Sequence, residues 1–126
     1  SDFLARFQRE AKAAAKFRHP NAIEIYEYGD GSDTGGLVYM AFEFVHGREL
    51  REVIREHGSI EPARAIRILA RVLAALERAH AQGIIHRDLK PQNVMIEDQG
   101  GEDGVKILDF GIAKIKSAEG GGQALT

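Results

Sequence analysis

The chain has 126 residues, with 17 basic and 19 acidic side chains and a formal net charge of −2. This length fits one small domain, and the near balance of charge gives no general attraction toward nucleic acid or anionic lipid. Cysteine is absent, which excludes disulfides and thiolate metal sites. No apolar run in the sequence approaches the roughly 20 residues that span a bilayer, and the first residues lack the basic-then-apolar form of a signal peptide.

The first half of the chain predicts a helix followed by two strands. Residues 3–17 carry apolar side chains at three- and four-residue steps and are rich in alanine, so they predict a helix that ends before Pro20. Residues 22–28 and 37–44 are rich in strand-forming side chains and predict two strands. The intervening segment 29–36, dense in Gly, Asp and Ser, predicts a turn.

Two helices are predicted in the second half. A short helix is expected over 49–56, closed by Gly58, and a long helix from Pro62 to Ala81. The apolar stripe of the long helix is expected on Ile66, Leu69, Leu73, Leu76 and His80. Its arginines, at positions 64, 67, 71 and 78, are expected on a solvated face, and a helix lying on a membrane surface is the alternative.

Short strands are predicted after the long helix, at 84–85, 94–96 and 105–108. The last two are expected to be joined by a turn that contains Gly100, Gly101 and Gly104. The glycine-rich end of the chain, 117–126, is expected to be mobile.

A polar segment at 86–93 carries the residues with chemical potential. It reads H-R-D-L-K-P-Q-N, and D-F-G begins at Asp109. A carboxylate at Asp88 can orient a hydroxyl and accept its proton, while Lys90 places a compact cation two residues away. Asn93 and Asp109 offer oxygen atoms of the kind that Mg²⁺ prefers. Either aspartate alone would be an ordinary turn residue, but the whole set indicates phosphoryl transfer.

These two segments resemble the catalytic loop and the magnesium-binding turn of the protein kinase family. Lys90, two residues after Asp88, resembles the serine/threonine class of the family rather than the tyrosine class, and residues 7–11 resemble helix C of bacterial kinases. The resemblance implies an α+β, two-lobe protein-kinase-like fold, present in part from helix C to the activation loop. An N-lobe portion would occupy 1–43 and a C-lobe portion 44–126. It also implies transfer of the γ-phosphate of ATP to a protein Ser or Thr hydroxyl, with Mg²⁺ or Mn²⁺ as the metal.

The resemblance further implies a role for each polar residue. Asp88 would be the catalytic base, Lys90 would steady the γ-phosphate, and Asn93 and Asp109 would hold magnesium. Glu10 resembles the helix-C glutamate that binds the lysine of strand 3 and so helps to grip ATP. An ordinary surface pair with Arg6, four residues earlier, is the alternative for this glutamate.

The adenine site is expected around the second strand. By the resemblance, Phe42 would be the gatekeeper, the backbone of Glu43 and Val45 would bind adenine, and Met95 would pack beneath its ring. A plain buried strand would have the same composition as this hinge segment.

Other residues near the motifs have proposed roles of a different kind. His86 is expected to pack beside Phe110 rather than to bind a metal, and the other four histidines show no metal spacing. Arg87 would pair with a phosphate on the activation loop. Thr126 and Ser117 are the candidate phosphosites, with a plain solvated loop as the alternative.

Parts of the family pattern do not occur in the sequence. Neither the glycine-rich loop nor the strand-3 lysine precedes Glu10, and Ala-Pro-Glu does not follow Asp109. We therefore expect a kinase fragment that alone is inactive and binds nucleotide weakly. The alternatives are a non-catalytic kinase-like binding or scaffold module and a small-molecule phosphotransferase. The expected partners are ATP and a protein substrate, without nucleic acid or a membrane segment. The expected location is the cytoplasm, with any membrane anchor elsewhere in the full-length protein.

Overall fold

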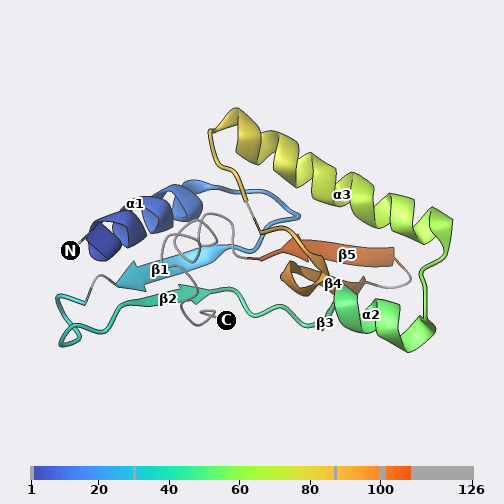
Figure 1. Cartoon of the computed structure of the whole chain (residues 1–126), viewed down its shortest axis with the longest axis horizontal. Helices are drawn as coiled ribbons and strands as arrows, with labels where there is room; N and C mark the ends of the chain where they lie inside the picture. The colour runs from blue at the N-terminus through green and yellow to red at the C-terminus, as the bar shows by residue number, and fades with distance from the viewer. Residues whose placement is uncertain (1, 30, 87, 100–101, 109–126) are drawn as a thin grey trace.

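The computed structural model describes residues 2–29, 31–86, 88–99 and 102–108. Its elements form two connected parts, a helix with a two-stranded sheet and a helical part with a three-stranded sheet. In chain order they are α1 (Asp2–Lys16), β1 (Ile25–Gly29), β2 (Tyr39–Phe42), β3 (Arg48–Glu49), α2 (Leu50–His57), α3 (Pro62–Ala81), the 3₁₀ turn η1 (Pro91–Asn93), β4 (Val94–Gln99) and β5 (Glu102–Ile107) (Figure 1).

The smaller part consists of α1 and the antiparallel pair β1–β2. Phe7 and Ala11 are buried on one face of α1 and pack against side chains of the hairpin, including Tyr28 and Met40. This three- and four-residue spacing of buried positions is the one that an amphipathic helix requires. The predicted helix is therefore confirmed, and the two predicted strands form over shorter spans than expected.

The larger part is built on an antiparallel sheet in the order β3-β4-β5. Helix α3 lies along this sheet and α2 follows directly from β3 (Figure 1). The main core lies between α3 and the sheet and includes the almost completely buried Val53, Val105 and Ile107. Gly58 ends α2 in the left-handed conformation, with φ of 74°, as the sequence predicts.

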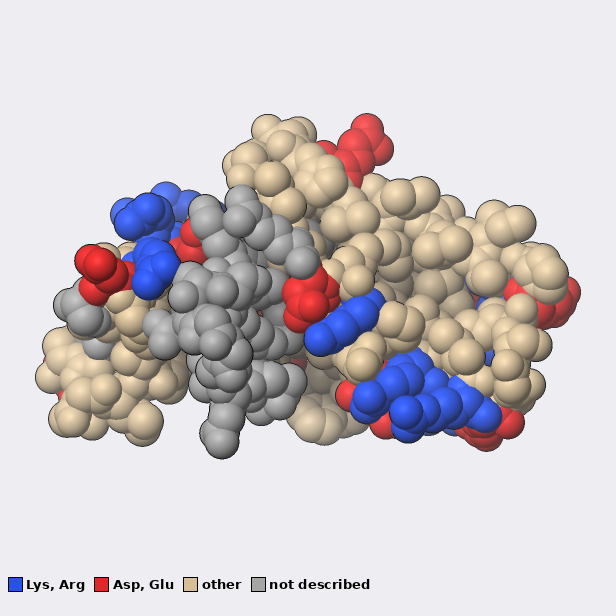
Figure 2. Space-filling model, in the orientation of Figure 1, with Lys and Arg blue, Asp and Glu red and all other residues tan. Residues whose placement is uncertain are grey.

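Helix α3 buries a different face from the expected one. Ile68, Val72, Ala75 and Ala79 face the core, whereas Ile66, Leu69 and Leu73 are 66%, 55% and 61% exposed. Leu76 does pack against the core, but the rest of the expected apolar stripe was wrong, because the helix is apolar on two sides and the prediction followed the larger side chains. Alanine and valine allow the helix to approach the sheet closely, so this face packs inward. The surface over α3 shows few charged side chains in Figure 2.

The strands of the larger sheet also differ from prediction. Residues 84–85 form no strand, and Gly104 lies within β5, paired with Glu97, rather than in the turn. Strand β3 was not predicted, since two residues carry no alternation. It forms because Gly47 lets the chain pass close to β4, where a side chain would collide with the Ile96 carbonyl oxygen.

An ion pair connects the start of α3 to β5. Arg64 donates two hydrogen bonds to Asp103, at 2.8 and 2.9 Å, and both side chains are more than two thirds buried. The expected solvated position of Arg64 was therefore wrong. Hydrogen bonding from Arg64 lowers the pKa of Asp103 despite partial burial, and the charges of Arg64 and Arg67 add to this effect.

This pair predicts an acid-sensitive contribution to stability. Because the folded pKa of Asp103 is below the unfolded value of about 3.9, the contribution is complete above about pH 5 and is lost as the pH falls through the folded pKa. We expect Asp103→Asn to lower the free energy of unfolding by about 1–2 kcal/mol at pH 7. Urea unfolding at pH 7 and pH 3 measures this, and the difference between the two proteins should shrink at pH 3. An equal difference at both pH values would contradict the assignment.

Residues 19–23 join the two parts of the molecule. Asn21 donates from its side chain to the Val105 carbonyl at 3.0 Å, and its own carbonyl accepts from Ile107 at 2.8 Å. Ile23 donates in turn to the Ile107 carbonyl at 2.9 Å. His19 accepts the Asn21 N–H on Nδ1, and burial, with a smaller effect of Arg78, lowers its pKa. This segment fixes β5 against the smaller part.

Candidate active site

The loop at 86–93 is held in place by a buried histidine. His86 is 2% exposed, its Nε2 lies 2.7 Å from the Leu108 carbonyl oxygen, and its Nδ1 lies 3.2 Å from the Asp88 amide nitrogen. A carbonyl only accepts, so Nε2 carries the hydrogen and Nδ1 accepts from the Asp88 N–H. His86 therefore connects Asp88 to Leu108, the residue that follows β5. The prediction that His86 is buried agrees with this geometry, but the two hydrogen bonds were not foreseen.

Asn93 connects the other end of the loop to the same strand. Its side chain is buried and Nδ2 donates to the Asp88 carbonyl at 2.7 Å. Its backbone N–H donates to Lys90, and its carbonyl accepts from Leu108 at 2.8 Å. Asp88 is thus held through its backbone from both sides, by His86 and by Asn93. Its carboxylate takes no part in these bonds.

The charged side chains of the loop lie beside each other at the surface. Lys90 Nζ is 3.3 Å from Asp88 Oδ2, and the two side chains are 45% and 35% exposed. An exposed pair of this kind stabilises the fold by less than about 1 kcal/mol. The structure therefore brings together three of the predicted residues, Asp88, Lys90 and Asn93, with both charges open to a ligand.

Several predicted residues lie outside the described part of the chain. These are Arg87, Asp109, Phe110, Ser117 and Thr126. The metal-binding role of Asp109, the contact of His86 with Phe110 and the phosphosites stay predictions. Leu108, which directly precedes Asp109 in the sequence, is bonded to both His86 and Asn93, so the segment that carries Asp88 is anchored to the last described residue before D-F-G.

Glu10 lies on α1, half-buried beside the apolar face formed by Phe7, Ala11 and Ala14. This is the position that the spacing predicts. The Arg6 guanidinium contacts the Asp2 carbonyl oxygen at 3.3 Å. The pairing of Glu10 with a strand-3 lysine stays a prediction.

The predicted hinge residues follow β2 in an extended segment. Phe42 ends the strand at 47% exposure, while Glu43 and Val45 are partly buried. The Glu43 N–H donates to the Glu24 carbonyl at 2.9 Å, and the binding of adenine by this segment stays a prediction. Met95 lies on the central strand β4, paired with Lys106 on one side and Glu49 on the other.

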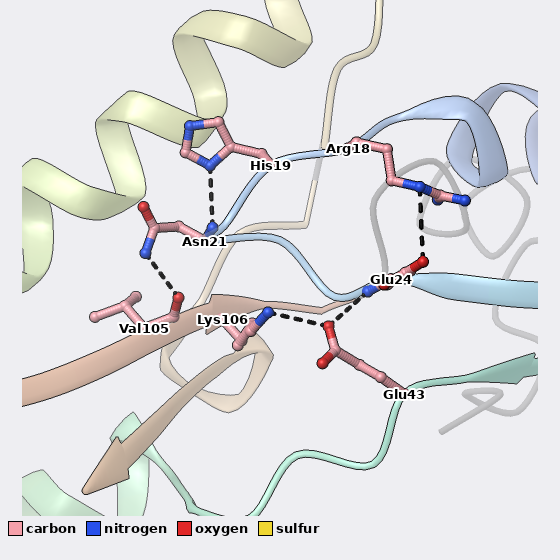
Figure 3. Close-up of polar contacts among 7 residues, drawn as sticks. All are labelled: Arg18, His19, Asn21, Glu24, Glu43, Val105 and Lys106. Carbon is pink, nitrogen blue, oxygen red and sulfur yellow. Dashed lines mark hydrogen bonds and ion pairs between the residues drawn. The ribbon is translucent and has the colours of Figure 1, made fainter. Parts of the chain in front are cut away.

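A cluster that sequence reasoning missed lies beside the hinge. Glu43 Oε1 accepts the Glu24 N–H at 2.8 Å and Lys106 Nζ at 3.1 Å (Figure 3). The available signal was Lys106 itself, a single charge inside the apolar run 105–108. A charge in such a run needs a partner, because burying it alone is costly.

Among residues 2–29, 31–86, 88–99 and 102–108, no group of three or more His, Asp or Glu side chains is arranged to hold a metal ion. In the same part of the chain, no helix combines the length and apolar character that crossing a bilayer requires.

The loop that carries Asp88, Lys90 and Asn93 is anchored to Leu108 at the end of the larger sheet, and comparison with known proteins identifies the class of protein. The family model for the protein kinase domain matches residues 1–123. The chain belongs to the protein kinase family, and its fold is a partial kinase fold of the α+β type.

The curated relatives are bacterial serine/threonine kinases. The chain is 47% identical over 124 residues to the serine/threonine-protein kinase pkn3 of Myxococcus xanthus, covering 98% of this chain and 22% of that protein. It is 37% identical over 118 residues to PrkC of Bacillus subtilis, covering 94% and 17% respectively. The chain thus spans about a fifth of the length of these relatives.

Solved structures of the same family have the same fold. The PknI kinase domain of Mycobacterium tuberculosis superposes with a TM-score of 0.73 at 31% identity, covering 89% of this chain and 44% of the solved one. At family level, therefore, the chain is similar to bacterial proteins that are named serine/threonine-protein kinases.

Proposed function

We propose that the protein carrying this chain transfers the γ-phosphate of ATP to a Ser or Thr hydroxyl of a protein substrate. The observation that supports it most is the anchoring of Asp88. Its backbone is fixed by His86 and Asn93, and both of these residues are bonded to Leu108. The backbone that carries this carboxylate is thereby held in a fixed relation to Leu108, which precedes D-F-G in the sequence, and phosphoryl transfer depends on positioning of this kind.

Each residue of the loop has a defined task in this reaction. Asp88 orients the substrate hydroxyl and accepts its proton as the bond from oxygen to phosphorus forms. Lys90, 3.3 Å from Asp88, can turn its ammonium group toward the phosphate and offset the negative charge there. The phosphorus–oxygen bond to ADP breaks in the same transfer, so the products are the phosphorylated hydroxyl and ADP.

The residues present suit a magnesium–nucleotide complex. The Nδ2 atom of Asn93 donates to the Asp88 carbonyl. The Oδ1 atom is therefore the part of this amide that could bind a metal. A neutral amide oxygen, with the carboxylate of Asp109, is a donor set that Mg²⁺ accepts together with phosphate oxygens. Bound Mg²⁺-ATP would supply the phosphoryl group and neutralise its charge. The Glu43 carbonyl and Val45 backbone would hold adenine.

The test is a transfer assay on the full-length protein that carries this chain. Radiolabelled ATP with Mg²⁺ and casein should give label on protein Ser or Thr, as identified by phosphoamino-acid analysis, and EDTA should abolish it. Binding of Mg²⁺-ATP without transfer to any protein, itself included, would favour a non-catalytic binding module. Label on small hydroxyl compounds alone would favour a small-molecule phosphotransferase.

A further inference from the structure

We propose that Glu43 and Lys106 are positioning residues. They hold the backbone of the hinge, Glu43 and Val45, in a fixed position relative to β5, the strand that leads to the predicted metal-binding turn. The inference rests on the proposed kinase function, because it concerns how the nucleotide site of that function is held. We refer to the Glu43–Lys106 ion pair, with its bond to Glu24, as the hinge brace.

The carboxylate of Glu43 joins three segments at one point. Its Oε1 accepts the Glu24 N–H at 2.8 Å and the Lys106 ammonium at 3.1 Å. The Glu43 N–H returns to the Glu24 carbonyl at 2.9 Å. Figure 3 shows the three segments converging on this carboxylate, the approach to β1, the end of β2 and strand β5. Glu43 is thereby fixed through both its backbone and its side chain.

Burial distinguishes this pair from the surface pairs around it. The side chains of Lys106 and Glu43 are 21% and 19% exposed, whereas those of the neighbouring pair Arg18–Glu24, at 3.7 Å, are 58% and 47% exposed. Solvent screens the second pair strongly. Removing one partner of the first pair leaves the other charge largely out of water and without its counter-charge.

The place of the brace in the chain gives it a consequence for ATP. Lys106 pairs with Met95 in the sheet and stands three residues before Asp109. Glu43 supplies the carbonyl assigned to adenine and stands two residues before Val45. The brace therefore joins the adenine end of the nucleotide site to the strand that leads to its phosphate end. Loosening it should weaken ATP binding more than it slows transfer.

The experiment compares Lys106→Met, Glu43→Gln and Lys106→Arg in the full-length protein, with Arg18→Met as the matched control from the exposed pair. Lys106→Met should raise the KM for ATP roughly tenfold, the factor that about 1.4 kcal/mol represents, with kcat within about threefold. Lys106→Arg, which keeps the positive charge, should retain most of the wild-type affinity for ATP. Combining Glu43→Gln with Lys106→Met should change the KM for ATP little further than Lys106→Met alone, because both substitutions remove the same ion pair. Arg18→Met should behave as wild type.

A second readout is independent of activity. Amide hydrogen exchange at Glu24 reports the bond to the Glu43 carboxylate directly, and Glu43→Ala should speed it several-fold, whereas Arg18→Met should not. Unchanged exchange would overturn the brace. Faster exchange with an unchanged KM would overturn its positioning role. A wild-type protein that binds Mg²⁺-ATP without transfer would refute the proposed function. The brace would then be tested by the dissociation constant for Mg²⁺-ATP, which Lys106→Met should raise; an unchanged constant would overturn it. A wild-type protein that binds no nucleotide would overturn both.

Discussion

Asp88→Asn is expected to lower kcat for protein phosphorylation by about a thousandfold, within the range that a positioned general base contributes. The loop should keep its structure, because His86 and Asn93 hold Asp88 through its backbone N–H and carbonyl, which asparagine retains. The lost pair with Lys90 is exposed, so the free energy of unfolding should change by less than about 1 kcal/mol. Radiolabel transfer and urea unfolding of the full-length protein measure the two effects.

The control for this variant is Asp33→Asn, which makes the same chemical change at an exposed position between β1 and β2. It should leave kcat at the wild-type value. A kcat for Asp88→Asn within tenfold of wild type would show that Asp88 is not the base. A large loss of stability would mean that its effect on kcat comes through the fold.

His86→Phe is expected to lower the free energy of unfolding by about 3 kcal/mol. The ring volume is nearly kept, but the Leu108 carbonyl and the Asp88 N–H both lose their partner in a buried place, at about 1–3 kcal/mol each. The activity should also fall, because Asp88 loses one of its two backbone anchors. Urea unfolding and the transfer assay check this, and heating should show a lowered Tm.

His57→Phe provides the comparison, since His57 ends α2 in an exposed position. Its free energy of unfolding should match wild type within about 0.5 kcal/mol. If His86→Phe proved equally stable, the two hydrogen bonds of His86 would contribute nothing, and its role would be packing alone.

The elements with strong local signals could be predicted from the sequence. The alanine-rich spacing of α1, the proline that begins α3 and the glycine that ends α2 act within a few residues, so they are readable without knowledge of the fold. The grouping of Asp88, Lys90 and Asn93 was equally readable, because the three residues lie within six positions of one another; their roles in the reaction stay predictions. The structure places these three residues together.

Features that depend on distant partners could not be predicted. Which face of α3 is buried depends on how closely the helix approaches the sheet, and both faces are apolar. Arg64 finds Asp103 39 positions away and Lys106 finds Glu43 63 positions away; no local pattern encodes such a pairing. Strand β3 exists only because Gly47 lets two backbones approach. Long-range packing decided each of these cases.

The exposed side of α3 has a practical consequence for work with the chain in solution. Ile66, Leu69 and Leu73 lie about one helical turn apart and form an exposed apolar strip along α3. At the concentrations used for crystallisation or NMR, we expect an exposed apolar strip of this kind to promote self-association. A preparation of this chain alone is therefore best handled dilute, and dyes that fluoresce on apolar surfaces will report α3 even when the chain is fully folded.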